Sequence, residues 1–155
     1  MSTGVRLAVD VGTVRVGVAG SDPGGLLASP LTALRRGSGD LDELVQLVRE
    51  REAVEVVVGL PTHLSGRAGS SAEMARSYGS ELAARIAPVP VRYVDERLTS
   101  VVAEQQLRGA RGRRSAKTGA RDRATGRVDA LAAAGILQTY LDGLPRTAPP
   151  REDPS

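Results

Sequence analysis

The sequence of 155 residues predicts a single α/β domain built on a mixed β-sheet. Two apolar segments with strand-like alternation open the chain, and strands then alternate with helices through the rest of it. The length suits one domain, which buries roughly two thirds of its unfolded surface. Since the chain has no Phe or Trp and only three Tyr, Val, Leu, Ala and Ile must fill the core.

The first expected elements are three strands. Residues 5–10 are mostly apolar and are followed by Gly12, which indicates a buried strand that ends in a turn. Residues 15–21 alternate again, so they are expected to return as the partner strand of a hairpin. A third, short strand is expected over residues 31–34, after which a Gly-rich stretch interrupts the pattern.

The middle of the chain predicts a helix, a buried strand and a second helix. Residues 40–51 carry apolar residues at helical spacing, with Asp40 in position to cap the helix. Residues 54–60 form an almost continuous apolar run, typical of a strand that is covered on both faces. Ser70 or Ser71 is expected to begin the next helix.

The last third predicts one more strand and two helices. A strand is expected over residues 91–95, a helix from Thr99 to about 107, and an Ala-rich helix over 128–141. The folded domain should therefore cover residues 1–143, and a disordered tail, rich in proline, should follow over 144–155.

Positive charge gathers in the segment from 108 to 127, where Asp122 is the single acid. The basic residues are Arg108, Arg111, Arg113, Arg114, Lys117, Arg121, Arg123 and Arg127. Such a density of positive charge suits contact with a phosphate backbone, so we expect a flexible arm that binds nucleic acid. The alternative is a solvated loop without a ligand.

The composition excludes several kinds of site. Cysteine is absent and His63 is the only histidine, so thiolate chemistry and multi-histidine metal sites are ruled out. His63 follows Pro61 and is expected to be an exposed or substrate-facing loop residue, not a general base. A metal ion would need carboxylate ligands, which favours Mg²⁺ or Mn²⁺. The sequence shows no signal peptide and no membrane-spanning run, so we expect a cytoplasmic protein without membrane contact.

Acids occupy positions where an unpaired charge is costly. Asp10 ends an apolar strand, Asp95 and Glu96 end another, and Asp129 opens an apolar helix. If the two strands are neighbours, Asp10 and Glu96 converge, and a divalent cation would offset their repulsion. Each acid also has an ordinary explanation: a turn cap for Asp10, surface ion pairs for Asp95 and Glu96, and the helix dipole for Asp129. A shared metal site explains the set together.

Four motifs give the chain a specific resemblance. They are Val9–Ala19, Val58–Pro61, Asp95–Ser100, and Asp129–Ala133 with Ile136–Leu137. In this order they resemble the motifs of the YqgF family, also called RuvX. That family is described as a Holliday junction resolvase and as the nuclease that matures the 5′ end of pre-16S ribosomal RNA.

The resemblance implies a ribonuclease H-like fold, a mixed five-stranded sheet flanked by helices, and a metal-dependent nuclease. It implies that Asp10, Glu96 and Asp129 are the catalytic acids and metal ligands. Residues expected to approach or contact the substrate are Gly12, Arg15, Arg97, Thr99, Arg113, Arg114, Lys117 and Arg121. Arg15 and Arg97 could instead pair with Asp95 or Glu96, and Thr99 could cap a helix.

Three functions compete at this point. The first is hydrolysis of phosphodiester bonds, with 5′-end maturation of pre-16S rRNA ahead of junction resolution in DNA. The second is a non-catalytic module that binds nucleic acid, which would not need the acids. The third, a phosphotransferase suggested by Asp10-x-Gly12-Thr13, would need a second domain for which the chain has no room. Structured RNA or branched DNA is the expected partner, and the protein could be a monomer or a homodimer.

Overall fold

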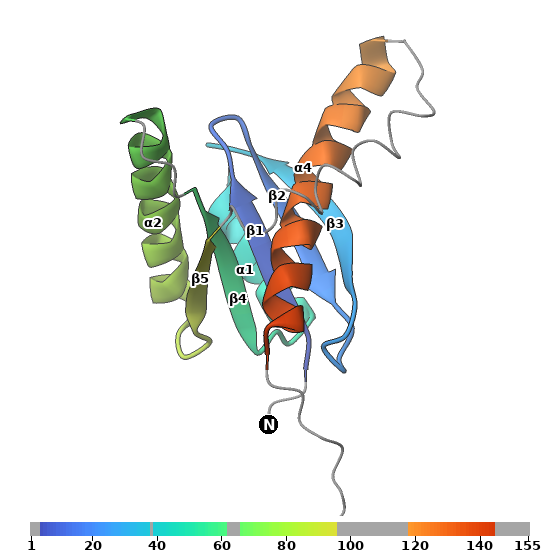
Figure 1. The fold of residues 1–155 in the computed structure, drawn as a ribbon, viewed down its shortest axis with the longest axis vertical. Coiled ribbons are helices and arrows are strands. Elements are labelled where there is room, and N and C mark those ends of the chain that lie inside the picture. The colour runs from blue at the N-terminus through green and yellow to red at the C-terminus, as the bar shows by residue number, and fades with distance from the viewer. Residues whose placement is uncertain (1–3, 38, 62–65, 96–117, 145–155) are drawn as a thin grey trace, which may run out of the picture.

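A computed structural model describes residues 4–37, 39–61, 66–95 and 118–144. In these ranges it has five strands and three helices, arranged around one sheet (Figure 1). The elements are β1 (Arg6–Val11), β2 (Arg15–Ser21), β3 (Ala28–Arg35), α1 (Asp40–Glu50), β4 (Glu55–Leu60), α2 (Gly66–Ile86), β5 (Val91–Asp95) and α4 (Thr118–Asp142).

The sheet is mixed and has the strand order β3-β2-β1-β4-β5. β1 pairs antiparallel with β2, as the predicted hairpin requires, and β2 pairs antiparallel with β3. β1, β4 and β5 run parallel, so their carboxyl ends share one edge of the sheet. The sequence left open whether the strand of Asp10 and the strand that ends at Asp95 are neighbours, and they are not, because β4 lies between β1 and β5. The shared edge, however, still brings their ends to the same side of the molecule.

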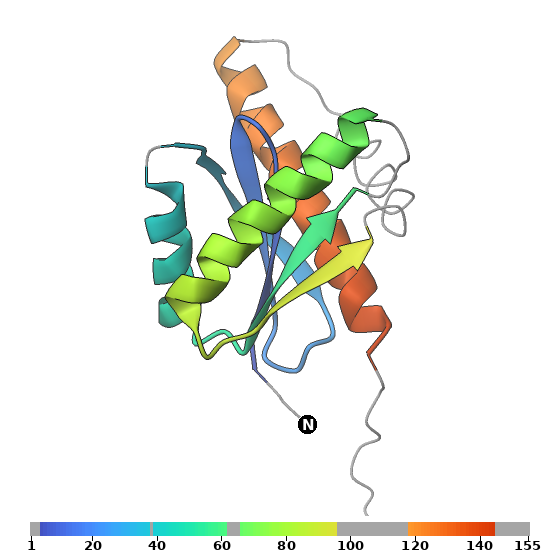
Figure 2. The same ribbon diagram turned by 90° about the vertical axis from the view of Figure 1, so that its left-hand side faces the viewer.

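Helices cover both faces of the sheet in three layers (Figures 1 and 2). α4 crosses one face, where it contacts β1, β2, β3 and β4, and α1 and α2 pack on the other. Mostly aliphatic side chains fill both interfaces, as the composition predicts, and the buried Tyr78 joins them on the α1 and α2 side. The core on the α1 and α2 side includes Leu7, Val9 and Leu44, and the core under α4 includes Ala8 and Leu137.

Alternation along the strands therefore assigns each position to a face. In β1, Val9 belongs to the α1 and α2 face and Ala8 to the α4 face, so Asp10 also belongs to the α4 face. β4 is buried along its whole length, which confirms the expected strand covered on both faces. This central strand gives the acid-bearing edge a rigid support.

Several element boundaries differ from the sequence predictions. β3 spans Ala28–Arg35, longer than the expected 31–34, because its pairing with β2 continues past an irregularity between the Val18–Thr32 and Ala19–Pro30 pairs. α2 begins at Gly66, before the serines that were expected to start it. The predicted helix 99–107, residues 108–117 of the basic segment, and residues 145–155 lie outside the described residues.

α4 begins at Thr118, ten residues before the predicted start of this helix at 128. The Ala and Arg residues of this stretch are good helix formers, and a helix already established over 128–142 is extended at little cost. The last part of the segment predicted as a flexible arm is thus helical. No helix in the ranges that the structure describes is long and apolar enough to cross a membrane.

The start of α1 also corrects a prediction. Its N-cap is Gly39, with φ of 89°, and no side chain caps the helix. Asp40 was expected in that role, but its carboxylate is buried and turned toward α2, where it accepts a hydrogen bond of 2.8 Å from the Tyr78 hydroxyl. A buried acceptor needs such a partner more than the exposed helix end needs a cap.

Candidate active site

Two of the predicted acids, Asp10 and Asp129, belong to the same face of the sheet. Asp10 lies near the carboxyl end of β1, and its cross-strand neighbour on β2 is Gly17. A Cβ atom added to Gly17 would overlap the main-chain oxygen of Asp129 in α4. Because Gly17 has no side chain, the helix backbone can lie directly on β2. This close approach brings Asp129 next to the cross-strand neighbour of Asp10.

Asp129 lies well inside α4 and not in its first turn. The helix dipole, which acts only within the terminal turns, therefore does not explain an acid at this position. Burial raises the pKa of the Asp129 carboxyl above its ordinary value, and the Arg15 guanidinium opposes that rise. The Arg15 Nη1 atom lies 3.9 Å from Asp129 Oδ2. Arg15, which could have paired with Asp95 or Glu96, is thus placed beside the third predicted acid.

The turn after Asp10 is closed by main-chain contacts of Gly12. Its N–H donates to the Arg15 carbonyl oxygen at 2.9 Å, and an added Cβ would lie 2.8 Å from that oxygen. The close approach that Gly12 allows in the structure is thus to the Arg15 carbonyl within the turn, whereas its expected approach to a metal or substrate stays a prediction. Arg36 supports the turn from β3's side, because its Nη1 donates to the Gly12 carbonyl oxygen at 2.8 Å.

Arg36 is in turn held by α1 and α2. Its guanidinium lies 5.2 Å from the centre of the Tyr78 ring, and its Nε lies 3.9 Å from Asp40 Oδ2. Burial favours a higher pKa for Asp40, but hydrogen bonds from Tyr78 and the Gly37 N–H outweigh it, and the pKa lies below its ordinary value. Burial and the Asp40 carboxylate raise the pKa of Tyr78. Asp40 thus stays ionised beside Arg36, which braces the turn.

Sequence reasoning missed Arg36, because it belongs to none of the four motifs. Its neighbour Gly37, with φ of 93°, marks a turn after β3 but does not say which side chain reaches back to β1. Only the pairing of β3 with β2, which includes a hydrogen bond of 2.8 Å from the Arg36 N–H to the Val14 carbonyl, reveals the connection.

Asp95 belongs to the other face of the sheet. An added Cβ on Gly79 of α2 would meet the Tyr93 ring, whereas Val94 packs into the core under α4. Alternation therefore assigns Asp95, like Tyr93, to the α2 face and away from Asp10.

The remaining predicted site residues are placed only in part. Arg121 lies within α4, and the structure does not describe its side chain. Outside the described residues lie Glu96, Arg97, Thr99, Arg113, Arg114 and Lys117, and also His63. Within residues 4–37, 39–61, 66–95 and 118–144, no group of three or more acidic or histidine side chains is arranged to hold a metal ion.

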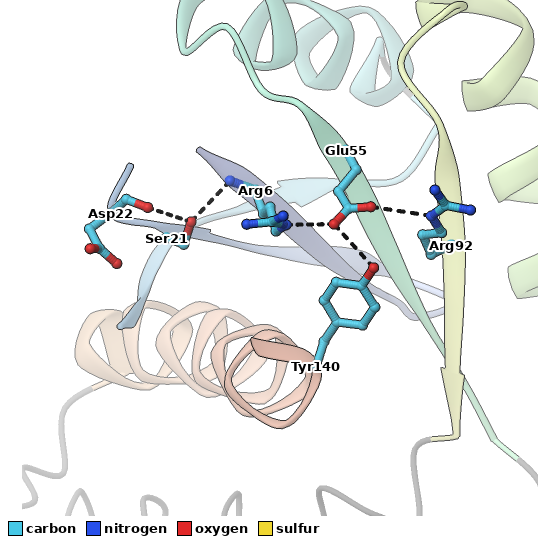
Figure 3. A network of polar contacts seen from close by, with 6 residues as sticks. All are labelled: Arg6, Ser21, Asp22, Glu55, Arg92 and Tyr140. Atoms are coloured by element: carbon cyan, nitrogen blue, oxygen red, sulfur yellow. Dashed lines mark hydrogen bonds and ion pairs between the residues drawn. The ribbon is translucent and has the colours of Figure 1, made fainter. Parts of the chain in front are cut away.

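A buried polar network at the opposite end of the sheet anchors the far end of α4 (Figure 3). The Glu55 carboxylate, at the start of β4, accepts hydrogen bonds from Arg6 of β1, from Arg92 of β5 at 3.2 Å, and from the Tyr140 hydroxyl of α4 at 3.1 Å. Burial alone would raise the pKa of Glu55, but these hydrogen bonds hold it below its ordinary value. The network ties α4 to three strands and so fixes the helix that carries Asp129.

Known proteins with similar sequences identify the family. The profile of the family described as RuvX, Holliday junction resolvase, matches residues 4–143. The chain belongs to the RuvX family. A relative from Frankia casuarinae is 56% identical over 150 residues, covering 94% of this chain and 70% of the relative. Another, from Thermobifida fusca, is 54% identical and covers 98% of this chain and 96% of the relative. Both are named "Putative pre-16S rRNA nuclease".

The RuvX chain also has a structural relative. The structure titled "T. thermophilus RuvC in complex with Holliday junction substrate" matches with a TM-score of 0.55 and 17% identity, over 89% of this chain and 93% of that chain. A second Thermus thermophilus RuvC structure gives a TM-score of 0.54. The likeness bears on the fold, and it confirms the predicted ribonuclease H-like architecture.

Proposed function

We propose that this RuvX chain is a metal-dependent nuclease that hydrolyses phosphodiester bonds, and that it acts in the 5′-end maturation of pre-16S rRNA. The names of its close relatives support the substrate. The observation that carries the activity is the packing of Asp129 onto Gly17, the cross-strand neighbour of Asp10. A protein that only binds nucleic acid has no need for two acids on the face where α4 meets the strand ends. A role in rRNA maturation also implies a cytoplasmic protein.

Glu96 is the third acid of the proposed site. Asp95 belongs to the α2 face, and side chains alternate along a strand. A strand continued by one residue beyond Asp95 would therefore turn position 96 toward the α4 face, which Asp10 and Asp129 share. The parallel order of β1, β4 and β5 supports this assignment, since all three strands end at the same edge.

The chemistry of these side chains suits a hard divalent cation. Oxygen ligands from Asp10, Asp129 and Glu96 match the preference of Mg²⁺ or Mn²⁺, whereas a zinc site would call for His or Cys. Such a cation, when bound, supplies an activated water and neutralises charge that develops on the phosphate. The raised pKa of Asp129 fits this assignment, because this half-buried carboxylate lies 3.9 Å from its arginine and lacks full charge compensation.

The other residues of this end have supporting roles in the proposal. Arg15 lies beside Asp129 and is available to bind substrate phosphate. Gly12 and Arg36 hold the turn that follows Asp10. The arginines and lysine of the basic segment are proposed to contact the phosphate backbone farther from the reacting bond.

The test is cleavage of a labelled 5′ segment of pre-16S RNA with Mg²⁺ or Mn²⁺, for the wild type and Asp10→Asn. We expect the wild type to cleave and the variant to lose at least about 100-fold in rate, as expected when a group that stabilises the transition state is removed. Asp42→Asn is the matched control, because Asp42 is exposed on α1 and pairs with Arg85. Equal cleavage by wild type and Asp10→Asn would contradict the proposal.

Resolution of Holliday junctions is the second candidate, favoured by the description of the family. A four-way DNA junction should be run beside the RNA in the same assay. Symmetric cleavage of a junction needs two active sites and hence a homodimer, whereas RNA cleavage is compatible with a monomer. If the wild type cleaves the junction but not the RNA, and Asp10→Asn loses that cleavage, the result would support the nuclease activity, with the junction and not the RNA as its substrate.

A further inference from the structure

Two arginines, Arg15 of β2 and Arg35 of β3, stand directly opposite each other in the sheet. The next pair along the ladder, Val14 and Arg36, is joined by a main-chain hydrogen bond. Since pairs in an antiparallel ladder alternate, Arg15 and Arg35 form a pair without main-chain hydrogen bonds, the kind in which side chains approach more closely. The two like charges are thus held at the shorter of the two cross-strand spacings.

Both arginines belong to the face that carries Asp10 and Asp129. Arg15 lies two positions from Gly17, which meets α4, and Arg35 lies two positions from Ala33. An added Cβ on Gly126 of α4 would lie 3.6 Å from the Ala33 Cβ, so this part of β3 also faces α4. Alternation therefore sets Arg35 beside Arg15 at the rim of the candidate active site.

Among the described side chains Arg15 has an acidic partner, whereas Arg35 has none. Asp129 is 3.9 Å from Arg15, and the ion pairs and hydrogen bonds formed by the described side chains include none with the Arg35 guanidinium. Arg35 is exposed, so its charge is available to a ligand. Like charges directly opposite in a sheet destabilise it, and an anion bound between them would reverse that effect.

We propose that Arg35 and Arg15 together bind a phosphodiester group of the substrate, next to the bond that is cleaved. Guanidinium groups suit phosphate because they present paired N–H donors to its oxygens. The inference rests on the proposed nuclease function for the position of the reacting bond, and it adds Arg35 as a substrate-binding residue outside the family motifs. The substrate strand would then cross the ends of β2 and β3.

The direct test is RNA binding by Arg35→Gln in an Asp10→Asn background, where no cleavage disturbs the measurement. Fluorescence anisotropy with a labelled 5′ segment of pre-16S RNA should show affinity lower by about tenfold, as expected for one lost charge-assisted contact. The slope of log affinity against log salt should fall by about 0.7 to 0.9, which corresponds to one phosphate.

Arg49→Gln in the same background is the matched control. It removes the same charge from an exposed arginine, but on α1, behind the opposite face of the sheet. It should change affinity and salt slope much less than Arg35→Gln does. Equal affinities and equal salt slopes for the two variants would overturn the inference. They would show that Arg35 contributes only to the overall positive charge.

A charge reversal separates binding from folding. Arg35→Glu would face Arg15 as an opposite charge, so the melting temperature should rise by about 1–3 °C while RNA affinity falls further than in Arg35→Gln. A melting temperature that falls together with affinity would show that Arg35 supports the fold, and would overturn the inference.

The two proposals can fail separately. If the wild type cleaves neither RNA nor junction, yet Arg35→Gln weakens binding as expected, the result supports the phosphate site and contradicts the proposed nuclease activity. If the wild type cleaves and Arg35→Gln binds RNA as tightly as Arg49→Gln does, the result supports the nuclease activity and contradicts the phosphate site.

Discussion

Gly17 shows how much of the proposed site depends on one missing side chain. The main-chain oxygen of Asp129 occupies the space that a Cβ at Gly17 would need. Gly17→Ala should therefore push α4 away from β2, lower the melting temperature by about 3–10 °C, and reduce cleavage even well below that temperature, because Asp129 is displaced. Thermal unfolding and cleavage at 20 °C measure the two effects.

Gly126→Ala is the control for this prediction. The same methyl group at Gly126 would find only an ordinary contact with Ala33, in the interior of α4. Replacing a helical glycine with alanine stabilises by about 0.5–1 kcal/mol, so this variant should melt higher than the wild type. If Gly17→Ala and Gly126→Ala behave alike, the close approach of α4 to β2 has no importance for the site.

Arg36 gives a second prediction at this scale. Arg36→Met removes the hydrogen bond to the Gly12 carbonyl and the ion pair with Asp40, while it keeps much of the side-chain volume. The turn after Asp10 should loosen, so kcat should fall about tenfold with little change in KM. The adjacent Arg35→Gln should instead raise KM. A raised KM with unchanged kcat in Arg36→Met would show that Arg36 binds substrate and does not position the turn.

Single residues were predictable where they belong to a motif. Asp10, Gly12, Arg15 and Asp129 were all singled out, and the structure brings them to one end of the sheet. Arg35 and Arg36 were not, because their importance depends on the pairing of β3 with β2 and on side chains from α1 and α2. Glu96 remains a prediction.

The described elements were predicted in the right order, with errors at their boundaries, and the helix expected over 99–107 stays a prediction. The strands were evident because β4 and β1 are buried and apolar on both sides. The early start of α4 was hidden, because its first residues are basic and polar and lack the spacing of apolar residues that indicates a helix. Strand order was also hidden, since alternation in one strand says nothing about which strand lies beside it.

The Glu55 network makes a prediction about how the elements are joined. Glu55→Gln would leave the buried Arg6 without its carboxylate, which should cost roughly 3 kcal/mol and lower the melting temperature by about 6–12 °C. Tyr140→Phe, which removes one hydrogen bond to the same carboxylate, should cost only about 1 kcal/mol.

The difference in stability between the wild type and Glu55→Gln should depend on pH in a definite direction. The pKa of Glu55 in the folded protein lies below its ordinary value of 4.5. Its ionised form therefore stabilises the fold above pH 4.5, and the stabilisation is lost as pH falls toward the folded pKa. Denaturation of wild type and Glu55→Gln between pH 7 and pH 3 should show that their difference in free energy of unfolding becomes smaller below about pH 4.5. A gap that stays constant over this range would contradict the assignment.

At the scale of the whole molecule, stability and activity should be separable. The Glu55 network lies where β4 begins, whereas Asp10 lies where β1 ends, so the two are at opposite ends of the sheet. Glu55→Gln should keep the kcat of the wild type at temperatures where it remains folded, and Asp10→Asn should lose cleavage without melting lower. A large fall in kcat for folded Glu55→Gln would show that the network controls the site from a distance.

The position of α4 at the end of the chain also bears on the order in which a newly made molecule matures. Among the described elements, α4 alone packs on one face of the sheet, over Ala8, Ala19 and Val57. At 5–20 residues per second, roughly 3–12 s separate the synthesis of Val57 from that of Thr118. During that interval the nascent sheet has an uncovered apolar face. Because Asp129 arrives on the same helix that covers this face, a growing chain cannot complete the proposed nuclease site before this side of its core is closed.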